Sequence, residues 1–341
     1  MTHATALRRK PLAAQGGLTR APQQVRVLAP LALIAALSAC APAPPNASAS
    51  GRASASPSAA AHSAEPTERA DLRGADDASL QAAATRALAA LGPAEVLLLG
   101  ELHDAPSHQA IERVVVQVLA QQGRLAALAM EMAEAGRSTA GLPRDADDAQ
   151  IRAALAWNDR GWPWRVYGPV VRAAVAAGVP VIGANLPSAE LQDAMKNTAF
   201  DDHLALESRQ KQYKNIIDGH CGLLGAAQVP PMARVQTARD ATMARSVLAA
   251  RKSGQVVLLV AGSGHVDAAL GVPTHLPPGV AARSIVLAAA TETAGSGDGA
   301  SRTQAADGGV QAQALWLTDA AAPKDYCAEL REQWGARGGS R

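Results

Sequence analysis

The amino-acid sequence predicts an α/β fold, in which a mostly parallel sheet is flanked by helices and carries a helical insertion at about residues 187–254. Two observations lead to this prediction. Short apolar runs of strand length alternate with Ala-rich segments whose apolar residues recur at helical spacing. A strand, a helix and a second strand in succession indicate a right-handed parallel unit, and repetition of that unit favours a sheet covered by helices.

The first forty residues have the pattern of an export signal. Basic residues precede an uncharged stretch from Val27 to Ala39, which at about a dozen residues is too short to cross a bilayer of roughly 30 Å as a helix. The residues ending at Cys40 resemble the lipobox at which lipoproteins are cleaved and acylated. We therefore expect a signal peptide over residues 1–39 and a membrane anchor through lipid on Cys40; an ordinary signal peptide cut near the same place is the alternative.

The chain after Cys40 divides into a spacer and a domain. Ala41, rather than Asp, follows the cysteine, which by resemblance favours an outer-membrane location, facing the periplasm or the surface. Residues 40–70 are rich in Ala, Pro and Ser and predict a flexible linker. Residues 71–335, about 265 residues, fit one α/β domain. The formal net charge of +2 includes the basic residues of the signal, and no basic stripe interleaved with aromatic residues indicates nucleic-acid binding.

The elements of the domain follow from their apolar patterns. Helices are predicted over Ser107–Gln122, Gly168–Ala177 and Arg234–Lys252. A tract of Gly, Ser, Ala and Asp predicts a disordered hairpin loop over residues 291–310. Buried strands are predicted at six short runs: Val96–Gly100, Leu125–Met130, Val179–Gly183, Val256–Val260, Ile285–Ala289 and Leu315–Leu317.

Two cysteines remain once Cys40 is assigned to the lipid anchor. Cys221 and Cys327 form one candidate pair, and in an oxidising compartment two remaining cysteines usually bond. Spacing alone does not show that they lie close together. A free thiol or a metal ligand at Cys221 is therefore the alternative.

Polar side chains follow four of the predicted strands directly. They are Glu101 and His103, Glu131, Asn185 and His265. Because ligands of an open parallel sheet bind beyond the carboxyl ends of its strands, we expect these residues to converge. Two histidines and two carboxylates suit a divalent metal such as Mn, Co or Zn, or acid and base catalysis without one. Taken singly, each is also explained as a hydrogen-bonded structural residue.

The motifs together resemble the ChaN-like haem-binding lipoproteins of the Tiki, TraB and erythromycin-esterase superfamily. The resemblance extends over nearly all of residues 95–290. One departure is Gln109, where family members often have a second histidine beside His108. The segments that carry the resemblance are Gly100–His108, Met130–Met132, Trp157–Tyr167, Gly183–Leu186, His220–Gly222 and Gly262–His265.

The resemblance implies haem binding at the surface helices rather than beyond the strands. It implies a tyrosinate ligand to the iron, supported by a histidine across a dimer interface, and Tyr213 and His220 fit these roles. A phenolate is a hard, anionic donor that suits ferric haem. Lys211 and Lys214 flank Tyr213 and are candidates to pair with the haem propionates. A solvated, amphipathic helix is the simpler explanation of the same residues.

These observations lead to two main hypotheses about function, and a structural lipoprotein whose strand-end crevice is vestigial is a third. The first is a haem-binding outer-membrane lipoprotein that acts in haem or iron uptake and forms a homodimer when it binds haem. The alternative is a metal-dependent hydrolase of the Tiki-like superfamily, acting on a peptide or a small ester through Glu101, His103, Glu131 and His265.

Overall fold

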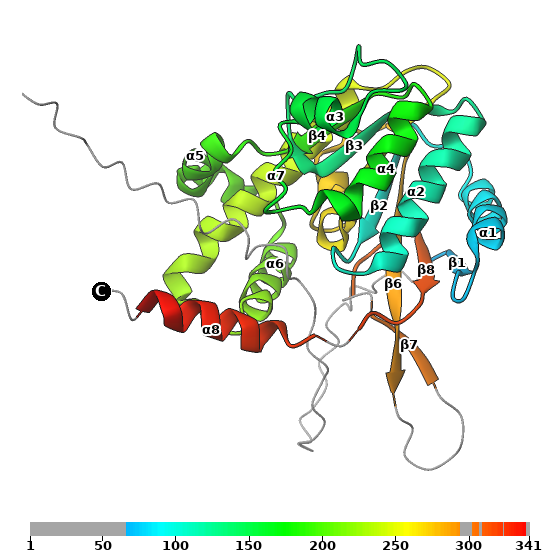
Figure 1. Cartoon of the computed structure of the whole chain (residues 1–341). Coiled ribbons are helices and arrows are strands. Elements are labelled where there is room, and N and C mark those ends of the chain that lie inside the picture. The colour runs from blue at the N-terminus through cyan, green and yellow to red at the C-terminus, as the bar shows by residue number, and fades with distance from the viewer. Residues whose placement is uncertain (1–65, 294–301, 307–308, 323, 339–341) are drawn as a thin grey trace, which may run out of the picture. The chain divides into compact units, whose positions relative to one another are not determined.

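The computed structural model describes residues 66–293, 302–306, 309–322 and 324–338 (Figure 1). The predicted signal peptide, Cys40 and most of the predicted linker lie outside the described residues. Within the described ranges, no helix combines the length and the apolar character needed to cross a membrane.

The described residues form an α/β fold around one sheet, as predicted. Seven parallel strands follow the order β1-β8-β6-β2-β5-β3-β4, and β7 pairs antiparallel with β6. The strands are β1 (Glu68–Asp71), β2 (Val96–Glu101), β3 (Leu125–Glu134), β4 (Val181–Asn185), β5 (Val256–Gly262), β6 (Ala282–Thr293), β7 (Arg302–Ala306) and β8 (Ala314–Thr318).

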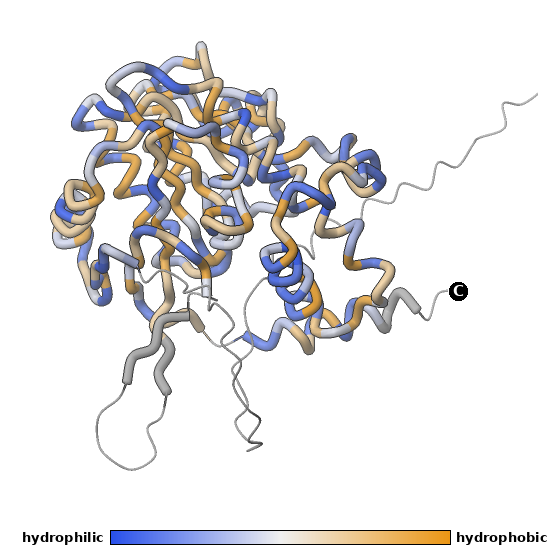
Figure 2. Tube along the Cα trace, turned by 180° about the vertical axis from the view of Figure 1, so that it is seen from behind, coloured by the Kyte–Doolittle hydropathy of each residue, from blue (hydrophilic) through white to orange (hydrophobic). Residues whose placement is uncertain are grey.

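Helices cover both faces of the sheet. In β2, Leu97 and Leu99 point into the apolar cluster shared with α1, α2 and α4, whereas Val96 and Leu98 point into the cluster shared with α7. Successive side chains of a strand face opposite sides, so a strand covered on both faces is a continuous apolar run. Figure 2 shows these runs as hydrophobic segments of the trace. The helices are α1 (Asp77–Ala90), α2 (Pro106–Gln121), α3 (Asp148–Leu155), α4 (Trp164–Ala176), α5 (Leu191–Lys196), α6 (Leu206–Gly219), α7 (Val229–Ala249) and α8 (Tyr326–Gly338).

The predicted insertion at residues 187–254 is helical, and its last helix begins earlier than predicted. It contains α5, α6 and α7 together with short 3-10 turns, one of which, η3, spans Thr198–Asp202. The helix α7 begins at Val229 rather than at Arg234. Two prolines occupy its first turn, where their fixed φ suits a helix and their missing N–H groups have no partner to lose.

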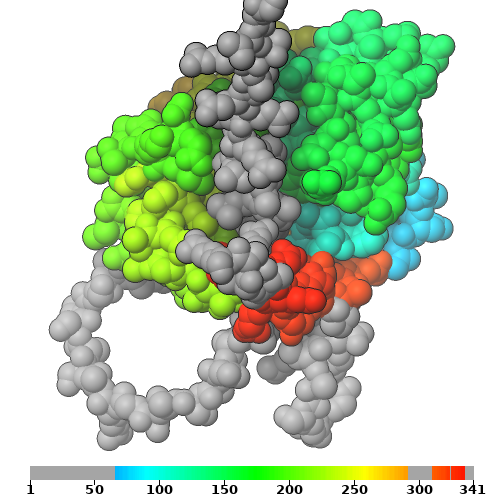
Figure 3. All heavy atoms as spheres, turned by 60° about the vertical axis from the view of Figure 1, so that its left-hand side comes forward, coloured from blue at the N-terminus to red at the C-terminus, as the bar shows by residue number. Residues whose placement is uncertain are grey.

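A disulfide joins Cys221 to Cys327, two residues that are 106 positions apart, so the predicted pairing is confirmed and Cys221 is neither a free thiol nor a metal ligand. Cys221 lies two residues after the end of α6, and Cys327 lies in the first turn of α8. The bond therefore fixes α8 beside the connection from α6 to α7. Figure 3 shows this end of the molecule, with α8 in red next to the yellow-green residues of the insertion.

Two predictions were wrong in part. The strand β1 begins at Glu68, inside the predicted linker 40–70, because its backbone pairs with the edge of β8. The predicted disordered loop 291–310 includes the end of β6 and all of β7, which form an antiparallel pair. Residues 294–301 and 307–308 of that loop lie outside the described residues.

Candidate functional site

The polar residues at the strand ends converge as predicted. Glu101 ends β2, Glu131 lies in β3, and His265 follows β5, which is hydrogen-bonded to both of these strands. Glu101 and Glu131 are almost fully buried. Asn185 lies beside them and donates a hydrogen bond from Nδ2 to the backbone oxygen of Glu131 at 2.9 Å, so it positions β3.

The glycines of the two Gly-x-x-His segments provide space for close packing. A Cβ atom on Gly100 would lie 2.5 Å from Cγ2 of Val266, and one on Gly262 would lie 2.9 Å from Nε2 of His103. Neither glycine has a positive φ, so the lack of space for a Cβ atom, and not the backbone conformation, accounts for them. A side chain at either position would displace the residues that form the cluster.

Glu131 lies between the two imidazole rings. One of its oxygens is 3.8 Å from Nε2 of His103 and accepts a hydrogen bond from the backbone N–H of Gly262 at 2.8 Å, while the other is 3.6 Å from Nε2 of His265. The Nδ1 atom of His103 is 2.8 Å from a carboxylate oxygen of Glu101. The Nδ1 atom of His265 is 2.6 Å from Asp240. Each histidine is thus held between two carboxylates.

These carboxylates favour the protonated form of both imidazoles and raise their pKa values. Burial by itself lowers the pKa of His265, but the charges of Asp240 and Glu131 outweigh it and raise the pKa to about 10. The pKa of His103 is raised in the same way, because Glu101 and Glu131 outweigh its burial. Burial by itself raises the pKa of Glu131, but the two imidazolium groups outweigh it and hold the pKa far below its usual range.

In the ranges that the structure describes, no group of three or more His, Cys, Asp and Glu side chains is placed to hold a metal ion. The predicted divalent-metal site at Glu101, His103, Glu131 and His265 is therefore not supported. The cluster has the groups for acid and base chemistry instead.

Residues from three helices complete the cluster, and their roles were not predicted from the sequence. Asp240 comes from α7, and burial raises its pKa to about 6 despite the charge of His265. The hydroxyl of Tyr167, on α4, donates to Glu101 at 2.8 Å. Gln109, on α2, donates to the other oxygen of Glu101, so the residue that departs from the family pattern has a partner in the cluster.

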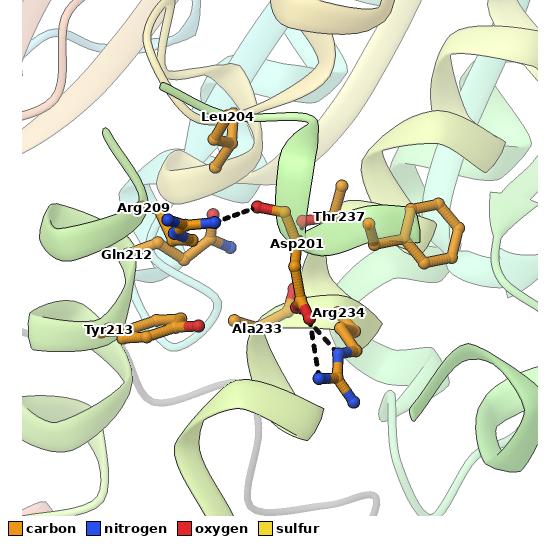
Figure 4. A pocket seen from close by; sticks show the side chains of 9 residues that line it. Asp201, Leu204, Arg209, Gln212, Tyr213, Ala233, Arg234 and Thr237 are labelled. Atoms are coloured by element: carbon orange, nitrogen blue, oxygen red, sulfur yellow. Dashed lines mark hydrogen bonds and ion pairs between the residues drawn. The ribbon is translucent and has the colours of Figure 1, made fainter. Parts of the chain in front are cut away.

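A second candidate site lies in the helical insertion, around Tyr213. A hollow with about 230 Å³ of empty space, open to solvent, lies between η3, α6 and α7. Tyr213 is half-buried, and its hydroxyl points across the hollow toward α7 (Figure 4). The residues that line the hollow are Phe200, Asp201, Leu204, Arg209, Gln212, Tyr213, Ala233, Arg234 and Thr237.

The other residues predicted to bind haem lie on or beside α6. His220 is buried, and its Nδ1–H donates to the backbone oxygen of Ile216 at 2.7 Å, which leaves Nε2 as the nitrogen with a lone pair when the ring is neutral. The ammonium of Lys211 is 2.8 Å from the buried carboxylate of Asp267. Lys214 forms an ion pair with Asp218 one turn along the same helix. Both lysines, which were predicted to pair with haem propionates, thus have a carboxylate partner within the chain.

Three solved structures resemble this chain. ChaN of Campylobacter jejuni, whose structure is described as binding haem cofacially, has 22% sequence identity and a TM-score of 0.47, with 62% of this chain and 86% of that chain covered. The type III effector HopBA1 has 15% identity and a TM-score of 0.36, covering 73% and 95%. A Bacillus cereus protein has 14% identity and a TM-score of 0.38, covering 66% and 71%.

No curated protein matches the chain. The family model described as haem-binding uptake, Tiki superfamily, ChaN matches residues 87–276, which is more than half of the 341 residues. The matched segment contains the strand-end cluster, which is formed by Glu101, His103, Glu131, Asp240 and His265, and the whole of α6. The chain therefore belongs to the ChaN family of haem-binding uptake proteins in the Tiki superfamily.

Proposed function

We propose that this chain is an outer-membrane lipoprotein that binds haem at α6 and acts in haem or iron uptake. The family match supports haem as the ligand. The strand-end cluster is buried and charged, and it offers no apolar surface for a porphyrin. The exposed side of α6 does.

The exposed face of α6 is the observation that carries this proposal. Of the large apolar side chains in the described part of the chain, Leu206 and Ile217 are the exposed ones, at 62% and 40%. At about 100° per residue, Tyr213 and Ile217 each lie within about 20° of Leu206 around the helix axis. Exposed apolar side chains next to a phenol suit the face of a porphyrin and its ferric iron.

His220 has a supporting role in this proposal. Its Nδ1–H is bound to Ile216, so Nε2 is the atom that accepts a proton or binds an acidic group. Tyr213 and His220 are seven residues apart, about two helical turns, which is too far for both to bind one iron within one chain. We therefore assign His220 to a haem held by a second copy of the chain, in a homodimer formed on haem binding.

The proposed anchor is consistent with the disulfide. Disulfides persist in oxidising compartments such as the periplasm and are rare in the cytosol. The bond between Cys221 and Cys327 supports export of the chain, and lipid on Cys40 would then hold it at the outer membrane. Replacing Cys40 with serine tests the anchor, because the variant should lose incorporation of labelled palmitate and leave the membrane fraction.

Haemin titration of the purified full chain, followed by the Soret band, tests haem binding. We expect a saturable shift of the band for the wild type. Tyr213→Phe should weaken binding and change the spectrum, because it removes the iron ligand and keeps the ring. Tyr326→Phe is the matched control, because Tyr326 lies in α8, outside the family match. A wild type that leaves the haemin spectrum unchanged would exclude the proposal.

A second candidate function, hydrolysis of a peptide or small ester, is supported by the arrangement around Glu131. In this proposal the carboxylate of Glu131 accepts a proton from water and the imidazolium of His265 donates one to the leaving group. The imidazoles are the accessible part of the cluster, since the side chains of His103 and His265 are 15% and 12% exposed.

Assays with fluorogenic peptides and nitrophenyl esters test this second function. Glu131→Gln and His265→Ala should abolish turnover, whereas His203→Ala, at an exposed histidine outside the cluster, should retain it. Absence of turnover by the wild type, or equal rates for wild type and Glu131→Gln, would remove the cluster from consideration as a catalytic site.

A further inference from the structure

The hollow beside Tyr213 carries an unbalanced positive charge. Two guanidinium groups and one carboxylate line it. Both oxygens of Asp201 are taken by Arg234, whose Nε and Nη2 atoms lie 2.8 Å away, and the remaining terminal nitrogen of Arg234 donates to the backbone oxygen of Met195 at 3.0 Å. Asp201 and Arg234 therefore neutralise each other.

Arg209 is the cation that remains. One of its terminal nitrogens donates to the backbone oxygen of Asp201 (Figure 4). Among the described residues, no carboxylate lies within ion-pair distance of its guanidinium. A guanidinium presents five N–H donors, so most of those of Arg209 remain for a ligand. Arg209 differs in this respect from Lys211 and Lys214 on the same helix, which both have carboxylate partners.

Gln212 is a second polar group in the wall of the hollow. Its side chain is more than nine-tenths buried, and its amide oxygen has no hydrogen-bond partner. A buried polar atom without a protein partner costs free energy, which a bound water or a ligand would recover. The amide has two donors and turns easily between its two orientations, so it can donate to a bound anion beside Arg209.

The geometry points to a carboxylate-binding site in this hollow, with Arg209 as its charged group and Gln212 as a donor, occupied in the haem complex by a propionate. The assignment rests on the proposed haem function and adds that Arg209 and Gln212 bind the haem propionate. Around the axis of α6, Tyr213 lies between the exposed apolar face, with Leu206 and Ile217, and the side that bears Arg209 and Gln212.

The size of the hollow agrees with a substituent and not with the whole ligand. The hollow is open to solvent, and the space that it encloses is about that of one water molecule, so only the tip of a ligand can enter it. A porphyrin ring would therefore lie on the exposed face of α6, and the carboxylate of one propionate would reach the mouth of the hollow beside Tyr213. Arg209 is four residues before Tyr213, so the two side chains are neighbours on the helix surface.

Haemin and haemin dimethyl ester, in which the propionates are masked, test the assignment on the full chain. Arg209→Gln should weaken haemin binding by roughly tenfold or more, because it removes a charge-assisted hydrogen bond, and should leave the affinity for the ester unchanged. Arg209→Lys should recover part of the haemin affinity, because it restores the charge without the planar fork. Lys252→Gln is the control, since it removes an exposed cation that lies outside α6 and outside the lining of the hollow.

The possible outcomes separate this assignment from the haem proposal. If the wild type binds haemin and Arg209→Gln binds it within twofold of the wild type, the carboxylate site is wrong and haem binding stands. An equal loss for haemin and its ester would likewise overturn the site, because the effect would then not involve the propionate. If the wild type binds neither porphyrin, the haem proposal fails first and this assignment falls with it.

Discussion

Replacing Cys327 with serine removes the covalent link between α8 and the end of α6. The bond closes a loop of 106 residues, and chain-entropy arguments give a loss of ~16 cal/mol/K for the unfolded chain, or about 4.8 kcal/mol at 25 °C. Greater freedom of the native state offsets part of this contribution of about 4.8 kcal/mol. The described hydrogen bonds and ion pairs of α8 join it to the preceding turn at Lys324 and Asp325, so α8 gains freedom once the bond is cut.

We therefore expect Cys327→Ser to lower the free energy of unfolding by roughly 2–4 kcal/mol. Urea unfolding followed by tryptophan fluorescence and circular dichroism measures this loss, provided that the slope with urea stays the same. Cys221→Ser should give the same loss, and the double variant should give no further loss. A loss under about 1 kcal/mol for both single variants would refute the reasoning, because α8 would then not contribute to cooperative stability.

Two further predictions concern the strand-end cluster. Gly100→Ala should lower the free energy of unfolding by roughly 1–3 kcal/mol in the same urea assay, because its Cβ would clash with Val266, whereas Gly264→Ala, whose Cβ meets nothing within 4 Å, should not. Asp240→Asn should lower the pKa of His265 from about 10, as measured by NMR titration of the imidazole. Because that pKa lies above its ordinary value, the stability that Asp240 contributes should decline between pH 7 and 10. A difference in free energy of unfolding between the wild type and Asp240→Asn that stays constant over this range would contradict the ion pair.

The strands covered on both faces were predictable, and the strands at the sheet margins were not. A segment such as Val96–Gly100 is apolar throughout because helices pack on both of its sides. The strand β1 alternates half-buried and exposed residues over only four positions, and its pairing depends on β8, about 245 residues later. The residues of β7 were part of a tract whose composition is typical of a loop.

The same distinction holds for the candidate sites. Glu101, Glu131 and His265 were predictable because the ends of parallel strands meet at one edge. Asp240 and Tyr167 reach the cluster from helices, and nothing in their local sequence indicates it. The partners of the α6 cations depend on tertiary packing: Asp267, which pairs with Lys211, lies 56 residues further along the chain.

The central claim is that this chain binds ferric haem through the phenolate of Tyr213. Resonance Raman spectroscopy of the haemin complex, with excitation in the phenolate-to-iron charge-transfer band, tests it most directly. We predict enhanced phenolate ring modes in the wild type and in Tyr326→Phe, and their loss in Tyr213→Phe. A haemin complex of the wild type without these modes, or modes that persist in Tyr213→Phe, would contradict the claim.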